Sequence, residues 1–154
     1  MSPQLGPSLS ALAFSILCVA APAWGSNHIV LPKDVTVVAP DGSIPADVAA
    51  FSGRWEGEWQ SGVPHVLIIR KITADSKGKY KVDAVYAWGD SHGGGLRKNF
   101  RECDGTISGG QLEVLIPPRA TATYKLVDGG AAIEGQWQAS RTATFSGKFT
   151  KVSQ

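Results

Sequence analysis

The chain has 154 residues, of which 43% are hydrophobic and 18 are glycine, and its net charge at pH 7 is +2. This length supports one domain, and glycine together with many Val, Ile, Thr and Trp residues is typical of an all-β domain with tight turns. The basic residues are scattered along the chain, so the charge pattern of a nucleic-acid-binding protein is not present and no nucleic-acid partner is expected.

Residues 1–25 have the pattern of a secretory signal peptide. Residues 9–23 are apolar or small, and Ala23 and Gly25 supply small residues at positions −3 and −1 of a cleavage site before Ser26. No Lys or Arg precedes this run, and the run is shorter and more interrupted than the roughly 20 apolar residues of a membrane span. We therefore expect cleavage, a periplasmic or secreted product, and no stable transmembrane segment after processing.

Cys103 is the only cysteine that remains if residues 1–25 are removed, because Cys18 lies within them. The mature chain then has no intramolecular disulfide and relies on its hydrophobic core. The thiol could pair between chains or act as a nucleophile. We expect instead that Cys103 is buried in a strand as a small hydrophobic residue.

Residues 26–50 predict an extended arm or linker before the main domain. They contain Pro32, Pro40 and Pro45 and an Asp-Gly turn at 41–42, between short extended pieces. One of these pieces is expected to dock on the domain as a strand. Residues 45–50 predict a single helical turn that leads into the first strand, with Phe51 closing one end of the fold.

The stretch 51–60, Phe-Ser-Gly-Arg-Trp-Glu-Gly-Glu-Trp-Gln, gives the clearest strand signal in the chain. Its aromatic and glycine residues share one parity, and its polar residues share the other. This alternation predicts a strand with one buried face and one wet face, with Glu56 and Glu58 on the wet face. A shorter echo, Glu-Gly-Gln-Trp-Gln at 134–138, predicts a similar strand late in the chain.

The domain 51–154 contains eight strand candidates separated by turn signals. The second is apolar on both parities, which predicts that both of its faces are covered. Regular spacing of about 8–12 residues favours a barrel or a sandwich. We predict an all-β fold, a small eight-stranded antiparallel up-and-down barrel, with a β-sandwich as the alternative. The candidate ranges are 52–60, 64–73, 79–89, 97–107, 111–117, 119–127, 131–139 and 141–152.

Gly53-Arg54-Trp55 at the start of the first strand, followed by an eight-strand meander, resembles the calycin superfamily of lipocalin-like and avidin-like barrels. The resemblance implies that the indole of Trp55 packs near a basic side chain from the end of the chain, namely Arg141, Lys148 or Lys151. The chain is shorter than a typical lipocalin and lacks its cysteine bridges and C-terminal helix. Its size is nearer to avidin or to small barrel inhibitors of bacterial metalloproteases, and it also resembles secreted bacterial domains that begin with a Phe-x-Gly-x-Trp-x-Gly-x-Trp strand.

Aromatic residues on the inward parity are candidates to line a ligand cavity, since they offer large rigid contacts with polar tips. The alternative is that they only fill the core of a small barrel. If a cavity exists, the Gly-rich loop 89–96 would be its lid, and Asp90 and His92 would form its polar edge. The predicted ligand-binding residues are Trp59, Tyr86, Trp88, His92, Tyr124 and Trp137.

No strong catalytic or metal motif accompanies these residues. Asp90-Ser91-His92 is a run of adjacent residues, whereas a triad is made by convergence in space. The string His-Gly-Gly-Gly at 92–95 lacks the Gly-x-Ser-x-Gly elbow that accompanies it in lipases. The three histidines are far apart in sequence, whereas zinc sites usually need three or four protein ligands. We therefore expect no enzyme, cofactor or metal site; Cys103 and His92 are the groups that an enzymatic role would use.

The favoured function is a binding module for a small, partly apolar ligand. The alternative is a protein-interaction module that uses the arm, such as an inhibitor of a secreted hydrolase or a partner of an envelope protein. The sequence does not indicate an oligomeric state.

Overall fold

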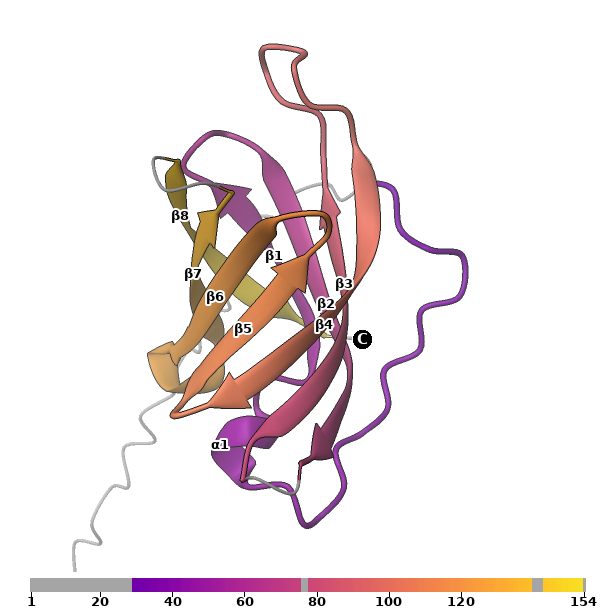
Figure 1. Ribbon diagram of the computed structural model, residues 1–154, viewed down its shortest axis with the longest axis vertical. Helices are drawn as coiled ribbons and strands as arrows, with labels where there is room; N and C mark the ends of the chain where they lie inside the picture. Colours follow the sequence, from indigo (N-terminus) through magenta and orange to yellow (C-terminus); the bar gives the residue numbers. More distant parts are fainter. Residues whose placement is uncertain (1–28, 76–77, 140–142, 154) are drawn as a thin grey trace, which may run out of the picture.

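Each strand pairs antiparallel with its neighbours in the chain, and the last strand pairs with the first, so the sheet closes into an up-and-down barrel (Figure 1). The computed structural model describes residues 29–75, 78–139 and 143–153. The predicted barrel is confirmed over the sandwich, and every predicted strand is present. The strands are β1 Gly53–Trp59, β2 Pro64–Ala74, β3 Tyr80–Trp88, β4 Asn99–Ser108, β5 Gln111–Ile116, β6 Ala120–Val127, β7 Ala132–Gln138 and β8 Thr144–Val152.

The two ends of the barrel are built differently. One end is closed by the short helix α1, Ala46–Ala49, and by Phe51, which is 1% exposed (Figure 1). The turn between β6 and β7 at the same end is the 3-10 turn η2, Asp128–Gly130, in which Gly129 and Gly130 adopt the positive φ values that favour glycine. The predicted helical turn and the plugging role of Phe51 are thus confirmed. The opposite end is formed by the β1–β2, β3–β4 and β5–β6 connections and the facing ends of β7 and β8.

Trp55 on β1 connects the barrel wall to the segment around Phe51 that closes the α1 end of the barrel. Its indole is fully buried, and its N–H donates to the carbonyl of Phe51 at 2.9 Å. The ammonium of Lys151 on β8 lies 5.0 Å from the indole centroid and donates to the carbonyl of Ala50 at 2.8 Å. An indole next to a basic side chain from the last strand is therefore present, and that side chain is Lys151 rather than Lys148. Partial burial lowers the pKa of Lys151.

The arm covers an apolar patch on the outside of the barrel. It runs along the outside of the wall toward α1 from the direction of the opposite end of the barrel (Figure 1). The N–H of Val38 donates to the carbonyl of Arg70 on β2 at 2.8 Å. The covered patch explains why β2 is apolar on both parities. The arm docks on the domain as expected, but its described residues 29–45 form no strand. The buried residues of the patch are Val66, Ile68, Val85 and Ala87, and Ile29, Leu31, Val35, Val37 and Phe100 pack against them.

A pair of glycines on neighbouring strands makes room for the aromatic core inside the barrel. Gly135 on β7 pairs with Gly147 on β8. A Cβ atom at Gly135 would lie 2.8 Å from the ring of Tyr124, and one at Gly147 would lie 2.7 Å from the ring of Phe149. Both distances are far below normal van der Waals contact, so the large rings occupy the space that side chains at these two positions would fill.

Cys103 lies on β4 and is 5% exposed, as the sequence predicted for a buried small residue. Burial raises the pKa of its thiol to about 11, so the thiol is protonated at neutral pH and is a poor nucleophile.

The expected signal peptide at 1–25, residues 26–28 of the arm, Cys18 and Arg141 lie outside the residues that the structure describes. Among the described residues, none of the helices is long and apolar enough to span a membrane.

Candidate functional site

His65 sits at the centre of an aromatic cluster inside the barrel. Residue 65 has the same parity on β2 as the core residues Leu67 and Ile69, and its side chain is fully buried. The three rings nearest to its imidazole come from β1, β3 and β8. The centroid distances are 5.3 Å to Trp59, 4.2 Å to Tyr86 and 5.1 Å to Phe149.

Two hydrogen bonds fix the tautomer of His65. Nδ1 lies 2.7 Å from the carbonyl oxygen of Ala87, and Nε2 lies 3.1 Å from the hydroxyl of Tyr124. A carbonyl can only accept, so Nδ1 carries the proton, and the lone pair of Nε2 then accepts from the Tyr124 hydroxyl. Burial in this apolar setting lowers the pKa of His65 to about 3, so the imidazole is neutral at neutral pH.

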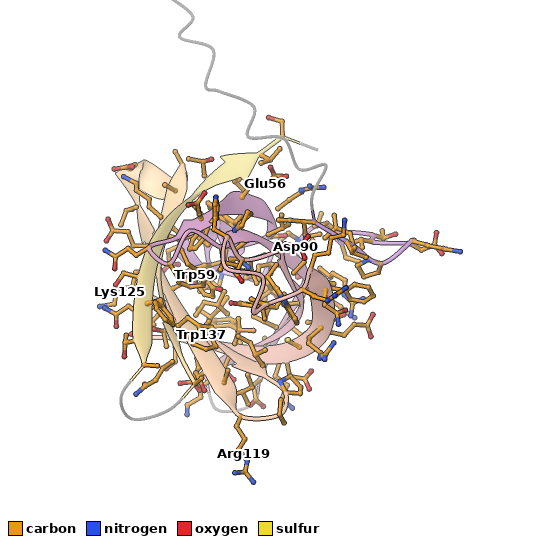
Figure 2. All side chains as sticks on the ribbon, turned by 90° about the horizontal axis from the view of Figure 1, so that it is seen from above. Glu56, Trp59, Asp90, Arg119, Lys125 and Trp137 are labelled. Carbon is orange, nitrogen blue, oxygen red and sulfur yellow. The ribbon has the colours of Figure 1, made fainter. Side chains whose placement is uncertain are left out.

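An apolar cavity of about 470 Å³ opens above this cluster, at the end of the barrel opposite α1. Seen from that end, Trp59 and Trp137 lie within the ring of strands, whereas the side chain of Arg119 points away from the barrel (Figure 2). The cavity is lined by Trp59, Ser61, Val63, Tyr86, Trp88, Leu96, Ile116, Pro117, Pro118, Arg119, Ala120, Trp137, Ala139 and Phe145.

The wall of the cavity contains two neighbouring polar groups, the indole N–H of Trp59 and the hydroxyl of Tyr86. The indole N–H of Trp59 is buried and has no hydrogen-bond partner. It lies beside the hydroxyl of Tyr86, but the two groups do not reach hydrogen-bond geometry. Burial raises the pKa of Tyr86, which the nearby indole N–H opposes, so Tyr86 keeps its phenolic proton at neutral pH.

The β3–β4 connection forms one side of the mouth and is held by several hydrogen bonds. The indole N–H of Trp88 donates to the carbonyl of Arg97 at 2.8 Å, and the N–H of Leu96 donates to the hydroxyl of Ser91 at 3.0 Å. On this loop only Leu96 lines the cavity.

Asp90 and His92, expected at the polar edge of a cavity, do not line this one. The carboxylate of Asp90 accepts from the N–H of Lys98 at 2.8 Å, a hydrogen bond within its own loop. His92 is exposed and lies over the β1–β2 turn, where a Cβ atom at Gly62 would be 3.5 Å from its ring.

Of the six predicted ligand-binding residues, four line the cavity, whereas His92 and Tyr124 do not. Trp59, Tyr86, Trp88 and Trp137 line the cavity together. Tyr124 lies deeper, fully buried, and serves as the hydrogen-bond donor to His65.

Sequence reasoning missed His65 and Phe145 as parts of this region. The signal for His65 was its parity with Leu67 and Ile69 in a strand covered on both sides. Phe145 is 36% exposed, and its ring centroid lies 5.6 Å from that of Trp137 at the mouth. It is the second residue of β8, at the end of the barrel opposite α1.

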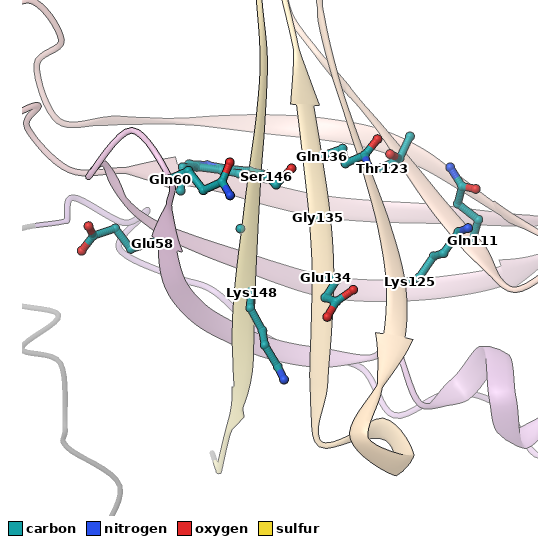
Figure 3. A pocket seen from close by; sticks show the side chains of 12 residues that line it. Glu58, Gln60, Gln111, Thr123, Lys125, Glu134, Gly135, Gln136, Ser146 and Lys148 are labelled. Carbon is teal, nitrogen blue, oxygen red and sulfur yellow. The ribbon is translucent and has the colours of Figure 1, made fainter.

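A second hollow, of about 730 Å³, lies over the polar face of β1, β6, β7 and β8 and reaches Gln111 on β5 (Figure 3). Cross-strand pairing places alternating charges in one row, Lys125, Glu134, Lys148 and Glu58. Opposite charges on neighbouring strands favour this pairing, while the ammonium of Lys148 forms its ion pair with Asp128 of η2 at 2.7 Å. A parallel row of amide and hydroxyl groups contains Thr123, Gln136, Ser146 and Gln60.

Among the residues that the structure describes, no three His, Cys, Asp or Glu side chains come close enough to hold a metal ion. No protein-family model matches the chain, and no curated protein matches it at a significant level.

Proposed function

We propose that the protein binds a small, largely apolar molecule in the cavity at the open end of the barrel. The observation that carries this proposal is the apolar cavity of about 470 Å³ that three tryptophans, Tyr86 and Phe145 help to line. Its volume falls within the range of about 300–1,000 Å³ that is usual for ligand sites. A barrel whose core was simply filled would bury these rings at this end, whereas here Trp88 and Trp137 are only partly buried.

Two features support a carrier rather than an enzyme. The cavity wall offers aromatic contact area with few polar groups. The imidazole of His65 is fully buried beneath this wall and is neutral. A general acid or base needs contact with the reacting group and a pKa near the working pH, and His65 has neither. The proposed compartment is the periplasm or the exterior, which rests on the residues at 1–25.

We also propose kinship with calycin barrels. Its support is the eight-strand up-and-down topology together with the contact between Trp55 and Lys151. In this scheme the open end is the ligand entrance, and α1 with Phe51 closes the other end.

The test is a fluorescence titration with N-phenyl-1-naphthylamine, a neutral probe that brightens in apolar sites. Wild-type protein should bind it with saturation at one site. Ala120 lines the cavity, so Ala120→Phe should fill the cavity and lower the affinity at least tenfold. Ala131→Phe adds the same bulk to an exposed position at the closed end and should leave binding unchanged. No saturable binding, or equal binding by both variants, would contradict the proposal.

A second candidate is a protein-interaction module that uses the polar hollow. The row of alternating charges favours it, since such a row gives a partner a specific register. The arm is a poorer candidate for the contact because it already covers the patch around Val66 and Ile68. Cross-linking in the native compartment should yield a partner adduct that the double variant Lys125→Glu, Lys148→Glu loses. An adduct that persists in this variant would exclude the hollow as its site.

A further inference from the structure

The polar groups around the cavity differ in whether they are already satisfied. The indole N–H of Trp88 donates to a backbone carbonyl, and the hydroxyl of Tyr124 donates to His65. The indole N–H of Trp59 is buried without a hydrogen-bond partner among the described residues, and the hydroxyl of Tyr86 lies beside it. Trp59 is 4% exposed, so water does not readily solvate its N–H, and an unmet donor in such a place is costly.

The indole N–H of Trp59 and the hydroxyl of Tyr86 can form a chain of two hydrogen bonds. The indole N–H of Trp59 can only donate, and the oxygen it faces is that of Tyr86. When Tyr86 accepts from Trp59, its own proton is left to donate elsewhere. Since burial keeps this hydroxyl protonated, Tyr86 presents a hydrogen-bond donor at the wall of the cavity that it lines.

The charge around the cavity limits the ligand further. Arg119 is the one charged side chain among the described residues that line the cavity, and it points away from the barrel (Figure 2). The neutral His65 below the aromatic wall offers no counter-charge either. A charged group brought into this cavity would lose its hydration without compensation.

We propose that the cavity selects a neutral, largely apolar molecule that carries a hydrogen-bond acceptor, such as a ketone or ester oxygen, at its inner end. This oxygen accepts from the hydroxyl of Tyr86, whose oxygen in turn accepts from the indole N–H of Trp59. The rest of the molecule stacks against Trp88, Trp137 and Phe145 near the mouth. This inference rests on the proposed binding function and names the ligand class for the same cavity.

The test compares two probes of similar shape, 2-acetylnaphthalene, which has a ketone, and 2-isopropylnaphthalene, which has no acceptor. Affinities are measured by displacement of N-phenyl-1-naphthylamine from wild type and from Tyr86→Phe. Loss of one hydrogen bond should weaken the ketone about fivefold to tenfold in Tyr86→Phe, and the hydrocarbon should change less than twofold.

Tyr80→Phe is the matched control, because Tyr80 lies at the far end of the same strand and does not line the cavity. It should leave both affinities unchanged, and near-ultraviolet circular dichroism should show that both variants keep the wild-type fold. If both probes bind and Tyr86→Phe weakens them equally or not at all, the acceptor inference is wrong while the binding function stands. If neither probe binds the wild-type protein, both proposals are wrong.

Discussion

The buried imidazole of His65 should make the protein sensitive to mild acid. In the folded state its pKa is about 3, because burial penalises the charged form, whereas in the unfolded chain it should be near the ordinary value of about 6.5. The unfolded state therefore takes up a proton first as the pH falls. Stability contributed by the neutral imidazole is present above about pH 6.5 and is lost as the pH falls toward 3.

The size of this effect follows from the two pKa values. Each pH unit between them costs about 1.4 kcal/mol, so lowering the pH from 7 to 4.5 should remove roughly 2.5 kcal/mol through His65 alone. Urea unfolding at the two pH values measures this for wild type and for His65→Asn, which cannot titrate and whose amide can still donate to the carbonyl of Ala87. Carboxylates contribute equally to both proteins, so the difference between the two pH dependences isolates the imidazole.

His65→Asn should be less stable than wild type at pH 7 but should lose roughly 2.5 kcal/mol less on acidification. His92→Asn is the control, because His92 is exposed and its removal should leave the wild-type pH dependence intact. Parallel stability curves for wild type and His65→Asn would refute the account of a sealed, neutral imidazole.

Three further variants test the packing of the barrel. Lys151→Met should lower the free energy of unfolding by about 1–2 kcal/mol, since it removes the hydrogen bond and the cation–π contact at the closed end; an unchanged urea midpoint would contradict this. Gly135→Ala should cost about 2 kcal/mol because its Cβ meets an aromatic ring at 2.8 Å, whereas Gly42→Ala, with open space around it, should change little. Val37→Ser should destabilise the docked arm by about 1 kcal/mol and increase dye binding to the outer patch. Val38→Ser, at an exposed position, should change neither quantity, and equal effects of the two variants would argue against docking.

Much of the fold could be predicted because its signals are local. Alternation at 51–60 fixes which side chains of β1 face inward, and Asp128-Gly129-Gly130 marks the turn between β6 and β7. The double-sided apolar pattern of β2 likewise predicted a cover on its outer face, and the arm supplies it. Such patterns depend on parity and turn chemistry, which a single sequence displays.

The site was less predictable because it depends on how far each strand extends past the barrel wall. Tyr124 and Trp137 share the inward parity, yet Tyr124 is buried and Trp137 lines the mouth. Their depth is decided by strand stagger around the closed sheet, which periodicity does not encode. The position of His65 among the aromatic rings could not be predicted for the same reason. The hydrogen bond between Asp90 and the backbone of Lys98 has no sequence signature.

Native mass spectrometry tests the central claim most directly. Wild-type protein and Ala120→Phe would be incubated with an apolar extract of the culture that produces the protein, and each would be compared with a denatured sample. The account predicts an added mass on the wild-type protein that disappears on denaturation and is absent from Ala120→Phe. No added mass on the wild-type protein, or the same added mass on both proteins, would contradict the assignment of the open-end cavity as a ligand site.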